Sequence, residues 1–276
     1  MPVKFFDPPK EPMVKPAFQI VAFITAYEYL FEEPFTYPGE WHSMWEVLFS
    51  VEGDFDCVEE SRVYRLKSGE MLFHAPNEFH TLRTVGDGPQ HLLLITFYAE
   101  GEMPSALKEG VFKLTGQERD EFVRLHTHVK RFIDRQGPLE VGALCSLELS
   151  TFLARLALKS TANHYVSNSP SAMEYQRIID LMERNVCKGI TLSDIARQLG
   201  ISISYIKKVF MQYTGIPPMT YYNSIRLNEA KRLLAQGLSV REVSDRLEFS
   251  SPNYFSVFFK QQVGVSPSRY THDAKE

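Results

Sequence analysis

The first hundred residues contain alternating or solidly apolar runs of the length that is typical of β-strands. The clearest runs are FQIVAFITAY (18–27), EVLFSVEGDF (46–55), SRVYRL (61–66), GEMLFHAP (69–76) and HLLLITFYAE (91–100). Turn-forming residues separate them, among them Pro38-Gly39, Ser68-Gly69 and Gly86-Asp87-Gly88-Pro89. Many short strands at this spacing predict a β-sandwich or a β-barrel over about residues 17–100.

Beyond about residue 117 the apolar positions recur at the spacing of a helix. One predicted helix ends at Gly137-Pro138 and has an apolar stripe made of Phe122, Leu125, Val129, Phe132 and Ile133. A second continues to about Lys159 with Leu144, Leu147, Phe152, Leu153 and Leu156. Residues 117–159 therefore carry more apolar surface than the flank of a barrel needs, and we expect them to form the isologous interface of a homodimer.

The segment TANHYVSNSPS (161–171) is polar and rich in turn-forming residues, which indicates a linker. We expect a ligand-sensing and dimerisation domain over residues 1–162, a linker over 163–171 and a helical domain over 172–276. The expected fold class is α+β, with a β-barrel and two flanking helices followed by an all-α domain.

The helical third of the chain contains an internal repeat. The segment after Gly237 repeats the segment after Thr191 at an offset of 48 residues as far as the pair Ser202 and Ser250, and at 49 residues from the pair Tyr205 and Tyr254 onward. Each copy predicts a short helix, a tight turn and a longer helix, which is the helix-turn-helix unit. The helix that joins the copies, 217–235, is about 28 Å long. Successive major grooves lie about 34 Å apart, so one chain can place both units on DNA.

Composition and charge sharpen this division of the chain. The 276 residues are 44% apolar and 23% charged, which suits two globular domains. The net charge is −4, but residues 171–276 carry +4 and the first 170 carry −8, so the helical domain is the one suited to phosphates. The three scattered cysteines predict no disulfide framework and no structural zinc. With no apolar run of about 18 residues and no signal peptide, we expect no membrane span and a cytoplasmic protein.

Two segments of the helical domain resemble the DNA-binding domain of the AraC/XylS family of bacterial transcription regulators. They are SISYIKKVFMQYTG (202–215) and SPNYFSVFFKQQVGVSPSRY (251–270). The resemblance implies a regulator of transcription that binds double-stranded DNA through two recognition helices per chain. It also implies a cupin-like barrel in front that binds a small-molecule effector, and it makes RNA polymerase a further candidate partner.

The resemblance also places the residues that contact DNA. In the first unit these are Ser202, Ser204, Lys207 and Lys208, and in the second Pro252, Asn253, Ser256, Val257 and Lys260. Val257 stands where an arginine is common in the family, and Glu248 stands where the turn usually has glycine. Since valine contacts a thymine methyl group but donates no hydrogen bond to guanine, we expect the first unit to read more of the base sequence. For Lys207 and Lys208, contact with phosphate alone is the alternative.

The candidate effector site combines two remnants of the motifs by which cupin barrels bind metal. His42 precedes Glu46 by four residues, and His80 follows Gly69 by eleven, but Glu40 stands where a metal-binding cupin has a further histidine. Barrels of AraC type generally bind no metal, so we expect no metal and no cofactor. The expected ligand is a small molecule such as a sugar or a related metabolite. The expected effector-binding residues are Trp41, His42, Trp45, Glu46 and His80.

Strand alternation adds a restriction to this set. His42 and Glu46 share one face of their strand, and Trp41 and Trp45 point to the other unless a bulge intervenes. His74 and His91 are interpreted as structural histidines. Two other classes of function stay open, although we assign no catalytic residue. One is a cupin enzyme with a DNA-binding tail that holds a metal on His42, Glu46 and His80, and the other is an adaptor that has lost DNA binding.

Overall fold

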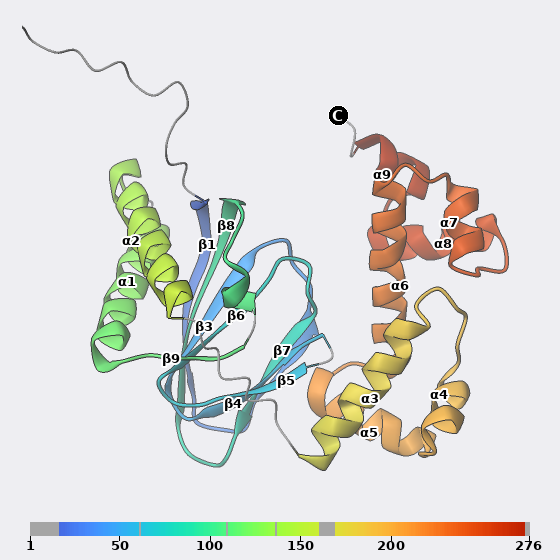
Figure 1. The fold of residues 1–276 in the computed structure, drawn as a ribbon, viewed down its shortest axis with the longest axis horizontal. Coiled ribbons are helices and arrows are strands. Elements are labelled where there is room, and N and C mark those ends of the chain that lie inside the picture. The colour runs from blue at the N-terminus through green and yellow to red at the C-terminus, as the bar shows by residue number, and fades with distance from the viewer. Residues whose placement is uncertain (1–16, 61, 109, 136, 160–168, 274–276) are drawn as a thin grey trace, which may run out of the picture.

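The computed structural model describes residues 17–60, 62–108, 110–135, 137–159 and 169–273, so residues 163–168 of the expected linker lie outside the described part. The strands form two antiparallel sheets (Figure 1). The larger has the order β1 (Phe18–Phe31), β8 (Gln90–Gly101), β3 (Trp45–Glu52), β6 (Glu70–His74) and β9 (Phe112–Lys113). The smaller has the order β2 (Thr36–Glu40), β7 (His80–Val85), β4 (Asp54–Glu59) and β5 (Arg62–Leu66). We call residues 17–113 the β-domain.

The apolar run 46–55 is not one strand, as the sequence suggested, but two. Gly53 adopts a positive φ of 81° and turns the chain from β3 in the larger sheet to β4 in the smaller. A side chain at this position would collide with Gln90, so the turn requires glycine. This turn leads the chain from one sheet to the other and sets the inner faces of both around a common interior.

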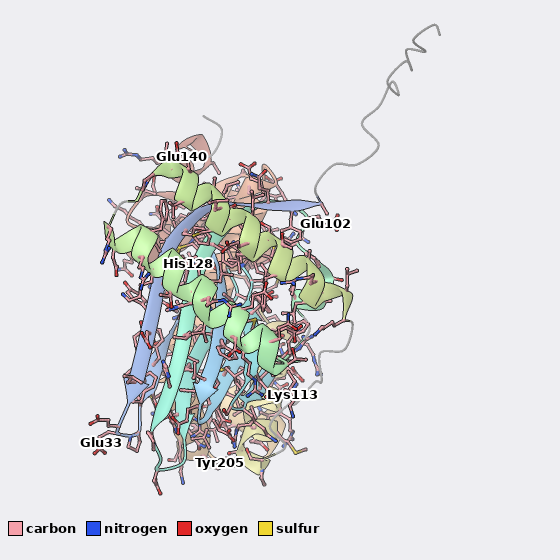
Figure 2. All side chains as sticks on the ribbon, turned by 90° about the vertical axis from the view of Figure 1, so that its left-hand side faces the viewer. Glu33, Glu102, Lys113, His128, Glu140 and Tyr205 are labelled. Carbon is pink, nitrogen blue, oxygen red and sulfur yellow. The ribbon has the colours of Figure 1, made fainter. Side chains whose placement is uncertain are left out.

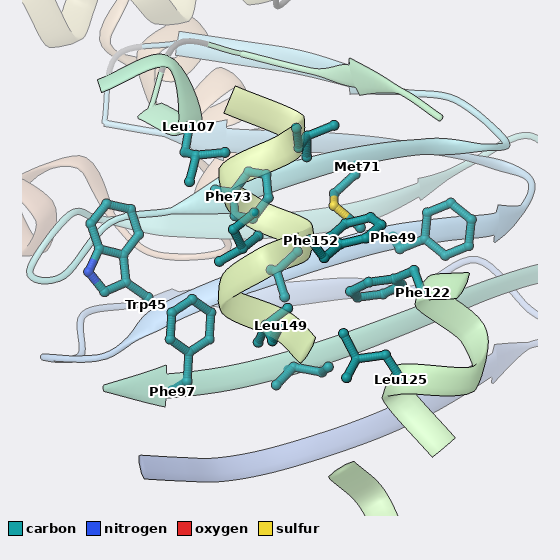
Figure 3. Packing of buried hydrophobic residues seen from close by; sticks show 14 of the residues in the cluster. Trp45, Phe49, Met71, Phe73, Phe97, Leu107, Phe122, Leu125, Leu149 and Phe152 are labelled. Carbon is teal, nitrogen blue, oxygen red and sulfur yellow. The ribbon is translucent and has the colours of Figure 1, made fainter. Parts of the chain in front are cut away.

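Two long helices, α1 (Gly116–Arg135) and α2 (Leu139–Leu158), cover the outer face of the larger sheet, as Figures 1 and 2 show. Their apolar stripes pack on β1, β3 and β8, and Figure 3 shows Phe122 and Phe152 next to Phe49 in this core. A short 3-10 helix, η1 (Ser105–Lys108), adds Leu107 to the same core.

The expectation that no helix could span a membrane is corrected for α2. By length and composition alone Leu139–Leu158 could cross a membrane, with a mean hydropathy of 1.5. The sequence search looked for an uninterrupted apolar run, whereas α2 spreads Glu140, Glu148 and Arg155 among its apolar residues. Here one face of α2 packs on the β-domain and buries Cys145, Leu149, Phe152, Leu153 and Leu156.

The C-terminal part is helical, as predicted. It consists of α3 (Pro170–Arg184), α4 (Leu192–Leu199), α5 (Ile203–Thr214), α6 (Pro218–Ala235), α7 (Val240–Arg246), α8 (Pro252–Val263) and α9 (Pro267–Asp273). Helix α3 starts inside the segment expected to be the linker. The helices α4 and α5 form the first unit of the repeat and α7 and α8 the second, joined by α6, whose 18 residues span about 27 Å.

The caps of these helices correct one detail of the repeat. The Ser202 side chain accepts a hydrogen bond from the Tyr205 N–H at 3.1 Å and caps α5, and Ser251 accepts from the Tyr254 N–H at 3.1 Å and caps α8. The counterpart of Ser202 is therefore Ser251 and not Ser250. The extra residue of the second copy lies before the cap, in the turn.

Candidate functional site

The first unit presents the amino-terminal half of α5 to solvent. Ser204, Lys207 and Lys208 are exposed, while Ile206 and Val209 between them are buried in the core. Within the described part of the chain, neither lysine forms an ion pair. Two unneutralised ammonium groups on one exposed helix face form a surface suited to the DNA backbone or to guanine. Ser202 lies at the same end, but its hydroxyl already accepts the capping hydrogen bond.

The second unit presents the corresponding face of α8. Pro252, Asn253, Val257 and Lys260 are exposed there. Ser256 is half-buried, and its hydroxyl donates to the Pro252 carbonyl oxygen at 2.8 Å. This face therefore has a single ammonium group and the Asn253 amide as its strong donors, and it is more apolar than the face of the first unit.

The β-domain encloses a cavity of about 370 Å³ between its two sheets. Apolar and aromatic side chains from β1, β2, β7, β8 and the β1–β2 connection form most of its wall: Tyr27, Tyr29, Phe31, Phe35, Tyr37, Leu82, Leu92 and Leu94. One end of the wall is polar and includes Glu40, His42, Glu46, His74 and His80. A largely apolar cavity with a few convergent polar groups is the usual form of a small-molecule site.

Glu40, His42, Glu46 and His80 form what we call the polar cluster. His42 Nε2 lies 3.7 Å from Glu46 Oε2, and His80 Nε2 lies 3.8 Å from Glu46 Oε1 and 3.9 Å from Glu40 Oε1. The side chains of Glu46 and His80 are only 7% and 4% exposed, whereas Glu40 lies at the mouth of the cavity and is 42% exposed. His74 supports the cluster from one side: its ring stacks on His80 and its Nδ1 lies 3.0 Å from Glu59 Oε1.

Burial and neighbouring charges fix the protonation of these groups. Burial raises the pKa of Glu46, but the imidazoles of His42, His74 and His80 outweigh this effect, so the net pKa lies below its ordinary value. The Glu46 carboxylate raises the pKa of His42. Burial lowers the pKa of His74 and of His80 to about 4, so both rings are neutral at pH 7.

The structure brings together three of the five residues that the sequence assigned to the effector, His42, Glu46 and His80. Among the described residues that line the cavity, neither tryptophan is found. Trp45 lies behind the sheet in the core shared with α1 and α2, where Figure 3 shows it near Phe97. Trp41 faces the helical domain, with its ring centroid 4.5 Å from that of Phe79 and 6.2 Å from that of Tyr221 in α6. Trp45 belongs to β3, where side chains alternate between the two faces of the sheet. Trp41 and His42 lie between β2 and β3, so the expectation that His42 shares a strand with Glu46 is wrong, and alternation does not fix the direction of Trp41.

The β-domain and the first unit share one core. Val58, Val63 and Phe79 of the β-domain are buried together with Tyr175 of α3 and Tyr221 of α6. Figure 1 shows α3 and α5 beside β5 and β7, while α7 and α8 lie at the other end of α6.

Glu60 fixes this contact from the β4–β5 turn. It accepts hydrogen bonds from the Tyr221 hydroxyl at its side chain and from the Tyr175 hydroxyl at its carbonyl oxygen, both at 3.1 Å. Its backbone has a positive φ of 47°, which is unfavourable for a residue other than glycine and is held here by these contacts.

Sequence reasoning missed several residues of the cavity. His74 was interpreted as structural, although cross-strand pairing places it opposite Glu46. The aromatic wall from Tyr27 to Phe31 also went unrecognised, because its alternation along β1 resembles that of any half-buried strand. The register of β1 against β8 brings these rings beside Leu92 and Leu94, and no local signal in the sequence gives that register.

Comparison with known proteins concerns both domains. Residues 195–273 match the family described as "Helix-turn-helix domain". The chain is 21% identical over 252 residues to the HTH-type transcriptional activator RhaS of Pectobacterium atrosepticum, which covers 86% of this chain and 88% of that protein. It is 24% identical over 228 residues to the HTH-type transcriptional regulator YbfI of Bacillus subtilis, covering 79% and 81% of the two chains.

Among solved structures, ToxT from Vibrio cholerae O395 aligns with 94% of this chain and 98% of its own, at 17% identity and a TM-score of 0.37. The matched helix-turn-helix domain, its two copies in the fold and the regulators that align along most of the chain agree with the resemblance found in the sequence. Residues 195–273 form a helix-turn-helix domain of the AraC type, and the chain is similar along most of its length to DNA-binding transcription regulators.

Proposed function

We propose that this protein is a cytoplasmic regulator, and not an enzyme, whose DNA binding responds to a small molecule held in the β-domain cavity. The sensing and dimerisation domain comprises residues 1–162, the linker 163–171 and the DNA-binding domain 172–276. The DNA-contacting residues proposed from the sequence, on α5 and α8, read adjacent major grooves. His42, Glu46 and His80 bind the polar part of the effector, and the aromatic wall binds the remainder.

One observation carries this proposal. In each of two short segments, 40–42 and 79–80, one residue faces the cavity while its neighbour in the sequence packs on the DNA-binding domain. Glu40 and His42 face the cavity, and Trp41 between them packs toward Tyr221. His80 faces the cavity, and Phe79 before it packs on the same tyrosine with ring centroids 4.9 Å apart. An effector that moves either segment moves its contact with α6, and so biases the equilibrium between arrangements of the two domains.

The cavity also restricts the chemistry of the effector. Its aromatic faces suit the C–H face of a sugar ring or a planar organic body. The buried imidazoles and carboxylates at its polar end suit hydroxyl or carboxyl groups. A compact metabolite with one polar end and one apolar or ring-shaped end satisfies both parts of the wall.

The outer face of α2 supports the proposed homodimer. Leu139, Leu144, Leu147 and Leu158 are all exposed by more than half, whereas the opposite face of the helix is buried. Exposed leucines on one helix face form an apolar patch that a second copy would cover. Light scattering at micromolar concentration without DNA should show a dimer, and Leu147→Glu should shift it to the monomer; a monomeric wild type would contradict the proposal. RNA polymerase is a further candidate partner.

A thermal-shift screen with two variants tests the response to an effector. Sugars and small carboxylates are screened on the wild type and on Leu94→Trp, which fills the cavity; a true effector raises the melting temperature of the wild type alone. That compound should also change the affinity for a DNA fragment selected from a random library. In Trp41→Ala it should still bind but no longer change DNA affinity. A compound that binds in the cavity and leaves wild-type DNA affinity unchanged contradicts the proposed function.

A further inference from the structure

We propose that the polar cluster is a binding site for a divalent transition-metal ion, with His42, Glu46, His80 and Glu40 as its ligands. This reverses the expectation of a metal-free cavity drawn from the sequence. Each of the four side chains offers a ligand atom, and these atoms all lie within 4.8 Å of one another. Ligand atoms about 2.1 Å from a tetrahedral ion lie about 3.4 Å apart, so the cluster has to close by up to about 1.4 Å to complete the site.

The histidines are oriented as metal ligands are. Nδ1 of His42 lies 3.1 Å from the Met44 carbonyl oxygen, and Nδ1 of His80 lies 3.0 Å from the Glu78 carbonyl oxygen. A carbonyl oxygen only accepts, so Nδ1 carries the proton in both rings, and in the neutral form of each ring the lone pair lies on Nε2. Fixing one ring nitrogen by a backbone carbonyl is the usual way in which a protein aims the other at a metal.

The surroundings of the His42 and His80 Nε2 atoms are a second observation that points to a metal ion. Both atoms are buried and have no hydrogen-bond partner among the described residues. Each lies near the Glu46 carboxylate, an acceptor only, at 3.7 Å for His42 and 3.8 Å for His80. These separations are too long for hydrogen bonds and exceed by a few tenths of an ångström the distance of about 3.4 Å between neighbouring ligands of a tetrahedral ion. A cation between the lone pairs satisfies all of them at once.

The donor set selects the kind of metal. Two imidazole nitrogens with two carboxylates suit Zn²⁺, Fe²⁺, Co²⁺, Ni²⁺ or Mn²⁺, whereas Ca²⁺ and Mg²⁺ prefer oxygen ligands alone. The Cys57 thiol, buried in a different cluster of the β-domain, adds no soft ligand to the set. All four ligands line the cavity, so coordination positions that they leave open would face it. If the proposed function holds, an oxygen of the effector occupies one of them.

The test measures metal binding alone, without effector or DNA, so that it can fail while the proposed function stands. The untagged full chain is stripped with a chelator and titrated with Zn²⁺, Co²⁺, Mn²⁺ and Mg²⁺. Binding is followed by calorimetry, by the visible absorption of Co²⁺ and by elemental analysis after gel filtration. The expected result is one Zn²⁺ or Co²⁺ per chain and no measurable binding of Mg²⁺.

Matched variants decide whether the cluster is the site. Glu46→Gln and His80→Ala should each weaken Zn²⁺ binding by about a hundredfold or more. His91→Ala, in which the lost histidine pairs with Glu28 away from the cluster, should bind as the wild type does. Glu40→His, at the exposed edge of the site, should keep one ion and change the Co²⁺ spectrum, which covers the case in which buried variants fail to fold. Equal binding by wild type and Glu46→Gln, an unchanged spectrum in Glu40→His, or no ion in the wild type would overturn the proposal.

Discussion

The two helix-turn-helix units have the same local fold and different surroundings. The core of the first unit is continuous with that of the β-domain, through Val58, Val63 and Phe79. The core of the second unit lies between α6, α7, α8 and α9, and no described residue of the β-domain belongs to it. The repeat therefore has one unit that packs on the β-domain and a second unit whose core, within the described part of the chain, contains no β-domain residue.

The close approach at α5 shows how tightly the first unit is held. Gly215 ends α5 with a positive φ of 66°, and a side chain placed there would lie 3.3 Å from the Cα atom of Pro38 in β2. The Arg83 guanidinium of β7 lies over the Tyr213 ring, 5.1 Å from its centroid. The exposed faces of the two recognition helices also differ in charge. Lys207 and Lys208 belong to the first unit, whereas the uncharged Val257 belongs to the second.

The largest effect is expected from removing the tyrosine that joins the domains. Tyr221 is fully buried and contacts Phe79, Phe210 and Glu60, so Tyr221→Ala should lower the free energy of unfolding by about 3–5 kcal/mol. Chemical denaturation measures this. The matched variant Tyr254→Ala, in the second unit, removes a tyrosine that is 59% exposed and should change stability by about 0.5 kcal/mol or less. Equal losses of unfolding free energy in the two variants would contradict the difference between the two units.

DNA binding tests whether the two recognition helices differ as their faces do. Lys208→Ala should cost about 1–3 kcal/mol at one base position if the lysine reads guanine, or lower the salt slope by about one if it contacts phosphate. Val257→Ala in the second unit should alter affinity less and leave the salt slope unchanged, because valine carries no charge. Titrations of a selected fragment at several salt concentrations measure both quantities. If affinity and slope stay the same in Lys208→Ala, the lysine is not in the interface.

The smallest effect concerns pH and the carboxylates between α3 and the β-domain. Burial, together with Glu60 and Asp180, raises the pKa of Glu183 to about 7. The folded state therefore binds more protons than the unfolded state between about pH 4.5 and 7, and stability contributed by this group falls as pH rises through that window. Denaturation at a series of pH values should show a smaller decline in Glu183→Gln. Glu248→Gln in the second unit should show the same decline of stability with pH as the wild type. If Glu183→Gln also shows the wild-type decline, Glu183 is not its source.

Local signals in the sequence were enough for the helical domain and for part of the site. Caps such as Thr191, Ser202 and Ser239 and the repeat itself act over a few residues, so the helices of 192–273 could be predicted from them. His42, Glu46 and His80 come together in the structure at the cavity end where motif spacing had grouped them.

The remainder depends on pairing across long distances in the chain. The contact of Trp41 with Tyr221 joins residues far apart in sequence, and the pairing of Glu46 with His74 depends on sheet register. Neither leaves a local pattern. The same reason explains why Trp41 was assigned to the effector: its place beside His42 in the sequence does not show that Tyr221 of α6 lies against its ring.

Hydrogen–deuterium exchange of the full chain tests the asymmetry most directly. Trp41→Ala removes a β-domain side chain that packs toward Tyr221 while leaving every residue of the helical domain in place. The loss of this contact should raise amide exchange in α3, α5 and the amino-terminal half of α6, with α7 and α8 unchanged. Exchange that rises equally in both units, or that rises in the second unit alone, would contradict the proposal that the β-domain acts on the DNA-binding domain through the first unit.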